Sequence, residues 1–335
     1  MVGANMRPII GITMGDASGV GPEIIAKALT AKSIYGICRP LVIGDADVMD
    51  GAIEVANARL KINSIKSVSG GKYVYGTMDI LDLNNIRMDC LKIGQVDEMA
   101  GKAAIEYVKK ATKLALKRDV HAIVTAPINK EAVNKAGYKF TGHTELLAKL
   151  TGTKHVAMML VAGPLRVVHV TTHVSLREAC DLIRKERVLA TIKLAHKAMQ
   201  SMGIKEPRIA VAGLNPHAGE GGLFGMEEIN EIKPAVSAAR NFRINAVGPI
   251  PPDTVFTRAK KGEFDIVVAM YHDQGHIPAK LSAFPGGVNV TIGLPIVRVS
   301  VDHGTAFDIA WKGIASPQSL IEAIALASKI ASTER

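Results

Sequence analysis

Cysteine and aromatic residues are scarce in this chain of 335 residues. The three cysteines, Cys38, Cys90 and Cys180, lie far apart, which argues against both a disulfide framework and a closely spaced zinc knuckle. Aromatic residues make up 4% of the chain and leave few rings for stacking on nucleic-acid bases. We therefore expect a protein of the reducing cytoplasm that does not bind nucleic acid.

Long apolar runs are also missing. Segment 155–170 comes closest to a membrane-spanning stretch, but Pro164, Arg166 and two histidines interrupt it. The chain leads directly into the apolar segment 8–14 and shows no cleavable signal pattern before it. These features predict a protein that does not enter a membrane, in agreement with a cytoplasmic location.

The chain is basic, with a formal net charge of +10. Its lysines and arginines are dispersed along the sequence, which argues against a dedicated nucleic-acid-binding face. Local positive charge suits a small anionic substrate or cofactor equally well, and the remaining excess suits a solvated surface.

Short apolar runs rich in β-branched residues alternate with segments of helical periodicity. This alternation is typical of an α/β fold with mostly parallel sheets, whose strands are apolar on both faces. The expected strands are 8–14, 39–44, 121–127, 155–162, 166–172, 208–214, 265–270 and 295–300, and the expected helices are 22–30, 97–118, 144–150, 176–202 and 316–333. No repeat or Ser- or Pro-rich linker is present, so two domains would be joined by crossing strands.

Three histidines follow the ends of apolar strands, namely His173, His217 and His272. In open α/β sheets, ligands bind outside the carboxyl ends of the strands. Three neutral imidazoles that converge there, with one position left open, suit a catalytic divalent metal ion. Each histidine could equally be an ordinary loop residue bonded to the backbone, and the pattern alone leaves both interpretations open.

Segment 271–280, YHDQGHIPAK, carries two histidines at i, i+4 spacing. Gly275 lies between them and Pro278 follows, which argues against a helix here. Placement directly after a strand favours His272 as the metal ligand. His276 is expected to have a structural role or to support the metal ligands without binding the metal itself.

Two segments near helix starts are weaker candidates. The first loop, 14–24, is rich in glycine and could approach an anion, but a tight turn explains it as well. It matches neither the GxGxxG nor the Walker A pattern. His143 and Thr144 open an expected helix and could contact a substrate, although Thr141 or Thr144 could simply cap that helix.

The last third of the chain combines cations with an amide. Lys280, Asn289 and Arg298 suit the grip of a phosphate or carboxylate, whereas surface charge is the alternative explanation for the two cations. The loop DHGTAFDIA, 302–310, offers backbone amides, a threonine and two carboxylates in a turn, and could hold a nucleotide without a Rossmann fingerprint.

Seven motifs occur in order across nearly the whole chain: GITMGDASGVGPEI, TAPINKEAV, GHTELLA, HVTTHVSLREA, NPHAGEGGLFGMEE, YHDQGHIPAKL and SVDHGTAFDIAWKG. They resemble the PdxA family, which comprises the 4-hydroxythreonine-4-phosphate dehydrogenases of vitamin B6 biosynthesis. They also resemble its catabolic branch, which oxidises 4-phospho-D-threonate and 4-phospho-D-erythronate. Ala17 stands where biosynthetic members usually carry proline, which favours the catabolic branch without fixing it.

The resemblance implies an isocitrate/isopropylmalate dehydrogenase-like fold, with two α/β domains flanking a central active-site cleft. We expect a first, nucleotide-side domain from 1–130 plus 280–335, and a second domain from 131–279. The resemblance further implies a homodimer whose active site lies at the subunit interface, because the ligand at the position of His272 comes from the neighbouring subunit. The loop at 302–310 is similar to the adenosine-holding loop of that superfamily.

Site residues carried over from the resemblance fall into four groups. The metal ligands would be His173, His217 and His272; the substrate contacts His143, Thr144, Lys280, Asn289 and Arg298; the cofactor loop Asp302, His303, Gly304, Thr305 and Asp308; and the proton acceptor one of Asp253, Asp273 and Lys280. The cofactors would be NAD or NADP and one divalent ion, with zinc, magnesium, manganese and cobalt all open.

The reaction implied is metal-dependent, NAD(P)-linked oxidation of the C3 hydroxyl of a small 4-phosphorylated four-carbon hydroxy acid, followed by decarboxylation. Two other functions compete with it. One is a metal-dependent phosphatase or aldolase that acts on a phosphorylated sugar acid, and the other is a non-catalytic phospho-acid binding protein. Reduction of the nicotinamide, seen as a rise in absorbance, would separate the dehydrogenase from both.

Overall fold

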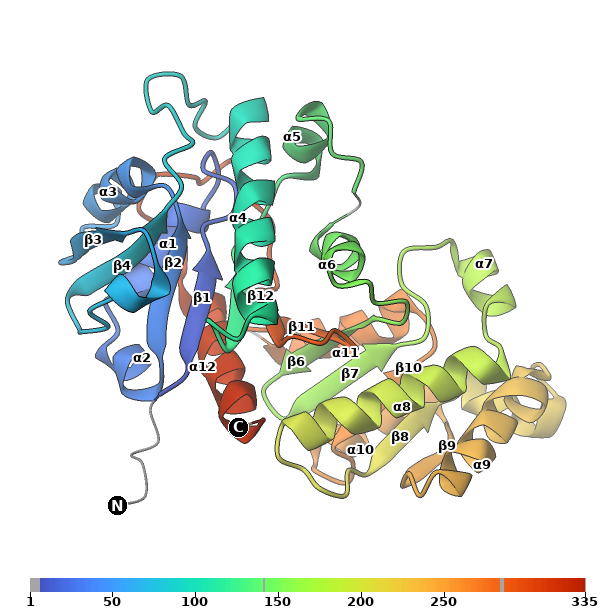
Figure 1. The fold of residues 1–335 in the computed structure, drawn as a ribbon. Helices are drawn as coiled ribbons and strands as arrows, with labels where there is room; N and C mark the ends of the chain where they lie inside the picture. The colour runs from blue at the N-terminus through green and yellow to red at the C-terminus, as the bar shows by residue number, and fades with distance from the viewer. Residues whose placement is uncertain (1–6, 141, 284–285, 335) are drawn as a thin grey trace, which may run out of the picture. The chain divides into compact units, whose positions relative to one another are not determined.

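The computed structural model describes residues 7–140, 142–283 and 286–334 (Figure 1). The chain divides into two compact units. Unit 1 comprises Met1–Lys154 and Leu294–Arg335, and unit 2 comprises His155–Gly293. The chain passes from unit 1 to unit 2 after Lys154 and returns after Gly293. Both boundaries lie later in the sequence than the expected ones, which followed residues 130 and 279. The expected boundaries differ because α5 and α6 pack on α4 within unit 1, and because β11 pairs with β6 within unit 2.

Unit 1 contains a parallel sheet. Its strands run in the order β3-β4-β2-β1-β5-β12 and all neighbouring pairs are parallel. The strands are β1 (Ile9–Thr13), β2 (Arg39–Gly44), β3 (Lys61–Ile65), β4 (Thr77–Asp82), β5 (Ala122–Thr125) and β12 (Arg298–Val301). Strands β1, β5 and β12 are fully buried, as the apolar runs of the sequence predict.

The helices of unit 1 are α1 (Gly21–Ala28), α2 (Lys32–Ile37), α3 (Ala46–Val55), α4 (Glu98–Leu116), α5 (Lys130–Lys135), α6 (His143–Thr151) and α12 (Gln318–Thr333). A short 3-10 turn, η1, spans Val68–Gly70. Asp45, Asp97 and Asn129 cap α3, α4 and α5 through side-chain oxygens that accept main-chain N–H bonds. Helix α4 packs on β1, β2 and β5, whereas α12 packs on β1, β5 and β12.

Unit 2 contains a mixed sheet in the order β11-β6-β7-β10-β8-β9. Its strands are β6 (Ala157–Ala162), β7 (Leu165–His169), β8 (Ile209–Ala212), β9 (Ala246–Ile250), β10 (Ile266–Ala269) and β11 (Val288–Ile292). Strand β6 is antiparallel to β7 and β11, and the remaining pairs are parallel. The sequence prediction missed β3, β4, β9 and β11, because these segments lack a long apolar run.

The helices of unit 2 are α7 (Leu176–Asp181), α8 (Lys185–Ser201), α9 (Lys233–Asn241), α10 (Pro252–Lys260) and α11 (His272–Ala283), with η2 (Pro216–Gly222) and η3 (Glu228–Ile232). The single helix expected over 176–202 is wrong, because extended backbone at Arg184 separates α7 from α8. No helix within the three described ranges is long and apolar enough to cross a membrane.

The expectation against a helix at 271–280 is also wrong. Helix α11 begins at His272 and contains both Gly275 and Pro278. Proline gives up one i→i−4 hydrogen bond, and the side chain of Gln274 fixes the first turn instead. Its Oε1 accepts a bond from Met270 N at 2.6 Å, and its Nε2 donates to Gly213 O at 2.7 Å.

Candidate active site

Two of the three candidate metal ligands lie together in unit 2. Strands β7, β8 and β10 are parallel neighbours, so the residues after them gather at one edge of the sheet. His173 follows β7, and His272 opens α11 directly after β10. Their ring centroids lie 6.0 Å apart. Both line a pocket of about 540 Å³, whose wall is formed by Thr172, His173, Val174, Ser175, Leu176, Glu178, Ala179, Tyr271, His272 and Asp273.

This pair fits a divalent ion. Metal–nitrogen bonds of about 2.1 Å place the centres of two coordinating imidazoles roughly 5–6 Å apart, close to the separation seen here. The Nδ1 atom of His272 lies 2.7 Å from Asp273 Oδ1. A carboxylate at Nδ1 holds the proton there and leaves Nε2 with its lone pair, as in carboxylate–histidine–metal arrangements. Asp273 is thus placed to orient His272.

His217 stands apart from this pair. Its ring centroid is 6.3 Å from that of Phe224, and the side chain is exposed. In the described part of the chain, no group of three or more His, Cys, Asp or Glu side chains is gathered to hold a metal ion. The resemblance takes the ligand at the position of His272 from a neighbouring subunit, whereas here His272 lies beside His173 of its own chain and His217 lies apart. The three-ligand set stays a prediction.

The loop that carries His217 has an unusual backbone. His217 to Gly221 all have positive φ, between 44° and 81°, so non-glycine residues adopt left-handed conformations in a row. The buried carboxylate of Glu228 holds the start of this loop, because its Oε1 accepts bonds from Leu214 N and Asn215 N, both at 2.7 Å. Glu228 is the last residue of the motif NPHAGEGGLFGMEE, but the sequence does not indicate that its side chain holds this loop.

The other candidates of unit 2 lie outside the pocket. Asp253 is exposed in the first turn of α10, Lys280 is exposed on α11, and Asn289 is half-buried on β11. None of the three is among the described residues that line the pocket of His173 and His272. Their roles in substrate binding and proton transfer stay predictions.

Unit 1 holds a second cluster of candidates at the carboxyl end of β5 and the start of β12. Arg298 is only 5% exposed, so its interpretation as surface charge is wrong. Its Nε and Nη2 donate to Thr125 Oγ1 at 3.2 and 2.7 Å. Burial lowers the pKa of Arg298 to about 9, and the guanidinium still stays protonated at neutral pH. It is therefore a buried cation.

His143 is neutral beside this cation. Burial, and then the charge of Arg298, lower the pKa of His143 well below its usual value. Its Nε2 is buried and has no hydrogen-bond partner within the described residues. Gly142 occupies the N-cap position of α6, so the capping alternative for Thr144 is wrong. Thr141 lies outside the described residues.

The proposed cofactor loop contacts the first loop of the chain. Val20 N donates to Thr305 O at 3.0 Å, and Trp311 Nε1 donates to Ala17 O at 2.9 Å. A Cβ atom at Gly19 would lie 2.9 Å from Thr305 O. The glycine therefore serves a close approach between the loops, which supports the tight-turn explanation of the first loop over an anion site.

The positions of the cofactor-loop residues follow from β12. Asp302, His303, Gly304, Thr305 and Asp308 all come directly after that strand, at the carboxyl edge of the unit 1 sheet. Asp302 N donates to Ser319 Oγ at 3.2 Å, which ties the loop to α12. The sequence prediction missed Asp16 beside this loop. It is fully buried, accepts a bond from Ser18 N at 2.9 Å, and has a pKa raised to about 6, chiefly by burial.

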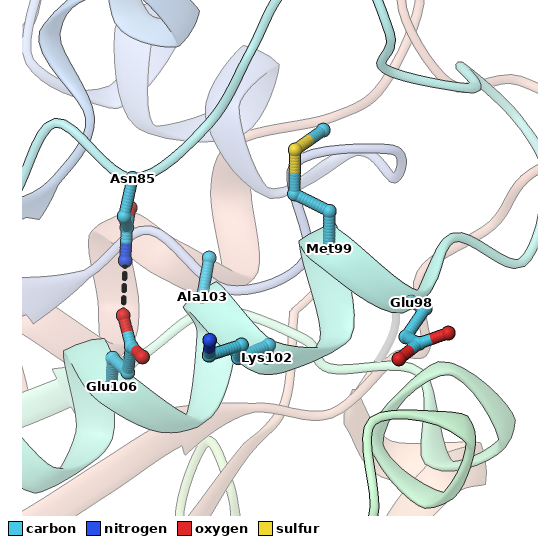
Figure 2. Close-up of a pocket in the computed structure, with 6 residues that line it drawn as sticks. All are labelled: Asn85, Glu98, Met99, Lys102, Ala103 and Glu106. Atoms are coloured by element: carbon cyan, nitrogen blue, oxygen red, sulfur yellow. Dashed lines mark hydrogen bonds between the residues drawn. The ribbon is translucent and has the colours of Figure 1, made fainter.

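A separate pocket in unit 1 holds none of the predicted site residues. It measures about 440 Å³ and is lined by Asn85, Glu98, Met99, Lys102, Ala103 and Glu106 (Figure 2). Asn85 Nδ2 donates to Glu106 Oε2 at 2.7 Å, and Asn85 Oδ1 accepts from Tyr107 at 2.7 Å. Because Asn85 is satisfied within the protein, this pocket offers no evident ligand site.

Comparison with solved structures defines the class of protein. The fold is similar to that of a β-decarboxylating dehydrogenase from Thermococcus kodakarensis, with a TM-score of 0.50 and 14% identity over 95% of this chain and 82% of that chain. The crystal structure of 4-hydroxythreonine-4-phosphate dehydrogenase from Klebsiella pneumoniae matches with a TM-score of 0.91 and 45% identity, over 98% of this chain and 99% of that one. The predicted isocitrate/isopropylmalate dehydrogenase-like α/β fold is confirmed.

A family model described as "Pyridoxal phosphate biosynthetic protein PdxA" matches residues 36–327. The chain belongs to the PdxA family. It is 50% identical over 325 residues to D-threonate 4-phosphate dehydrogenase of Cupriavidus necator, covering 97% of both chains. It is 51% identical over 323 residues to 4-hydroxythreonine-4-phosphate dehydrogenase of Desulforapulum autotrophicum, covering 96% of this chain and 95% of that one. The chain is accordingly an oxidoreductase of the dehydrogenase class.

Proposed function

We propose that this enzyme is a metal-dependent, NAD(P)-linked dehydrogenase that oxidises the C3 hydroxyl of a 4-phosphorylated four-carbon hydroxy acid, with subsequent decarboxylation. The observation that carries the proposal is the His173–His272 pair, whose ring centroids are 6.0 Å apart in a pocket that also contains Asp273. The names of full-length relatives at about half identity support the same chemistry.

The substrate class is a phosphorylated threonate or a close analogue. The relatives named above act, by their names, on D-threonate 4-phosphate and on 4-hydroxythreonine-4-phosphate, which share a four-carbon skeleton with a phosphate on C4. Ala17 in the first loop favours the catabolic substrates 4-phospho-D-threonate and 4-phospho-D-erythronate.

Arg298 and His143 would bind an anionic group of this substrate. The guanidinium donates through a planar fork that matches phosphate and carboxylate oxygens. A neutral His143 can donate one hydrogen bond without adding charge. As the resemblance implies, further substrate contacts would come from Thr144, Lys280 and Asn289. A buried cation attracts an anion more strongly than an exposed one, because the local dielectric constant is low.

His173, His217 and His272 would hold the divalent ion. When bound, the ion lowers the pKa of the substrate hydroxyl and stabilises negative charge that develops on oxygen. Asp273 would keep the His272 ring oriented through Nδ1. The proton acceptor would be one of Asp253, Asp273 and Lys280; of these, Asp273 lines the pocket and also contacts His272. The loop with Asp302, His303, Gly304, Thr305 and Asp308 would hold NAD or NADP.

The enzyme would act as a homodimer in the cytoplasm. Unit 2 exposes large apolar side chains on the segment after His217 and on α11, among them Leu223 at 73% and Leu281 at 81% exposure. Phe224, Met226 and Ile229 extend this set. Exposed apolar side chains of this kind commonly mark protein interfaces. An interface beside His217 would bring a second subunit to the site.

One assay tests the proposal. Purified enzyme is incubated with 4-phospho-D-threonate, 4-phospho-D-erythronate or 4-phosphohydroxy-L-threonine, each with NAD or NADP, and reduced nicotinamide and carbon dioxide are measured. We expect reduction with at least one substrate, and loss of reduction after chelation. Phosphate release without reduction would identify a phosphatase, and binding without turnover would identify a sensor. Either result would disprove the proposal.

A further inference from the structure

His169 and His276 lie beside the proposed ligand His272, and the proposed reaction uses neither of them. His169 is the last residue of β7, and His276 lies one turn after His272 on α11. Their exposed fractions are 3% and 8%, whereas the His272 side chain is 39% exposed. A polar side chain at this depth is normally hydrogen-bonded, and these two bond to each other.

Two neighbours hold the Nδ1 atom of the His276 ring. Its Nδ1 lies 3.2 Å from His169 Nε2 and 3.0 Å from the main-chain oxygen of His272. Burial, and then the neighbouring His276 and His272, lower the pKa of His169 to about 3. A main-chain oxygen only accepts, so the proton lies on Nδ1 of His276, and the oxygen of His272 and the Nε2 atom of neutral His169 share it.

Gly275 permits this close approach of α11 to β7. A Cβ atom at position 275 would lie 2.3 Å from His169 Nε2. Any side chain there would push the helix away from the strand and pull His276 off His169. The glycine that seemed to argue against a helix thus has a physical reason within the helix.

His272 stacks on this fixed ring. The His272 and His276 ring centroids are 3.6 Å apart, and the planes differ by only 10°. The stack fixes the plane of the His272 ring. The Asp273 carboxylate, 2.7 Å from Nδ1, fixes the rotation of the ring within that plane, so that Nε2 is the nitrogen that faces away from Asp273. A half-exposed ring at the first position of a helix has few other constraints.

We infer that His276, anchored by His169, is a positioning residue that holds the His272 imidazole in its metal-binding orientation. This inference rests on the proposed metal role of His272. A ring that is already oriented loses less rotational freedom when the metal binds, so the stack should raise metal affinity. A merely structural histidine would affect folding and leave the affinity unchanged.

Two variants separate the stack from the hydrogen bond. His276→Asn keeps an N–H donor close to the position of Nδ1 but has no ring, whereas His276→Phe keeps a stacking ring and has no donor. Metal-free, full-length enzyme is titrated with Co²⁺ and followed by its visible absorption spectrum. We expect His276→Asn to lower Co²⁺ affinity about tenfold and His276→Phe to lower it less than about threefold, the range that supporting contacts to metal ligands show.

Thermal stability of the same metal-free variants should follow the opposite order. His276→Phe leaves the buried Nε2 of His169 without a donor, which destabilises the fold more than the loss of a ring face does. Co²⁺ affinity of His276→Asn equal to that of the wild type would overturn the inference. Equal loss of affinity in both variants would also overturn it, because the stack would then have no part of its own.

His272→Ala in the same titration separates this inference from the proposed function. Wild-type Co²⁺ binding by His272→Ala would remove the metal role of His272, and the inference with it. Loss of binding in His272→Ala together with full binding in His276→Asn would overturn the inference alone. The stack is also visible without metal, because the NMR signals of the His272 ring should lose their ring-current shift in His276→Asn and keep it in His276→Phe. Unchanged signals in His276→Asn would count against it.

Discussion

The two candidate sites hold their functional side chains in opposite ways. In unit 1, Arg298 and His143 are both buried; burial lowers the pKa of each, and the charge of Arg298 lowers that of His143 further. In unit 2, His173 and His272 face an open pocket, and His272 is oriented by two neighbours, Asp273 and His276. A buried group is costly to disturb, whereas an exposed group depends on its local contacts.

The two sites are therefore sensitive to different kinds of substitution. Removal of a buried cation changes the binding of an anion strongly, because no water can replace the lost donors. Removal of an exposed ligand should abolish its function and leave the fold almost untouched.

Replacing Arg298 by Met should lower kcat/KM for the phosphorylated substrate about a thousandfold, because charged hydrogen bonds to an anion are worth about 1.5–3 kcal/mol each. Arg298→Lys should recover only part of this loss, since it keeps the charge but not the planar fork. Steady-state kinetics measures both. An unchanged KM and kcat would contradict the anion role.

Replacing His173 by Ala, or chelating the metal, should lower activity at least about a hundredfold through loss of hydroxyl activation. The melting temperature of the metal-free His173→Ala variant should stay within about 2 °C of the wild type, because the residue is exposed. His196→Ala, on the distant helix α8, is the control and should bind metal normally. Metal analysis and thermal denaturation measure the two effects. Full activity in stringently metal-free enzyme would rule out the metal role.

The two units should respond to acid with opposite signs at two buried groups. The pKa of His169 falls to about 3 on folding, so its contribution to stability is present above about pH 6.5 and is lost as the pH drops. The pKa of Asp16 rises to about 6, so its contribution is present below about pH 3.8 and is lost as the pH rises through 6.

Two variants measure these contributions between pH 4 and 6. Each group changes the slope of unfolding free energy against pH by at most about 1.4 kcal/mol per pH unit. His169→Gln should make the slope less positive, and Asp16→Asn should make it more positive, in urea denaturation of metal-free protein. Equal slopes in both variants and the wild type would show that neither group titrates as the geometry indicates.

The smallest effect is expected in the pocket of Figure 2. Replacing Glu98 by Gln should change kcat/KM less than about twofold and unfolding free energy by less than about 0.5 kcal/mol, because the residue is exposed and lies outside both sites. The same kinetic and denaturation assays apply. A large loss of activity would reveal a third functional region and end the simple contrast between the two sites.

The sequence predicts much of this arrangement, because parallel strands end at a common edge. The placement of His173 and His272 after strand ends follows from apolar runs alone, whereas Arg298 was expected inside a strand at 295–300 and instead begins β12. Burial of Arg298 does not follow, since it depends on strands brought together from distant segments. The sequence places His169 inside an expected apolar strand. Its contact with His276 arises only because α11 packs on β7, and the sequence does not predict that packing.

The errors have equally specific causes. Gly275 and Pro278 are poor helix formers, but contacts of Gln274 and His276 outweigh their intrinsic preference. Strand β11 is short and pairs antiparallel with β6, so no crossover pattern marked it. The start of the loop at His217 is held by Glu228, which lies eleven positions after His217 in the same motif, and the motif does not indicate this contact.

Unit 1 is completed by a segment that is synthesised after unit 2. Strand β12, with Arg298 at its start, and helix α12 leave the ribosome after the whole of unit 2. Until then β5 lacks its parallel neighbour β12, and the buried cation is absent. A nascent or prematurely terminated chain can therefore contain the histidines of unit 2 while it still lacks Arg298 and the last strand of the unit 1 sheet.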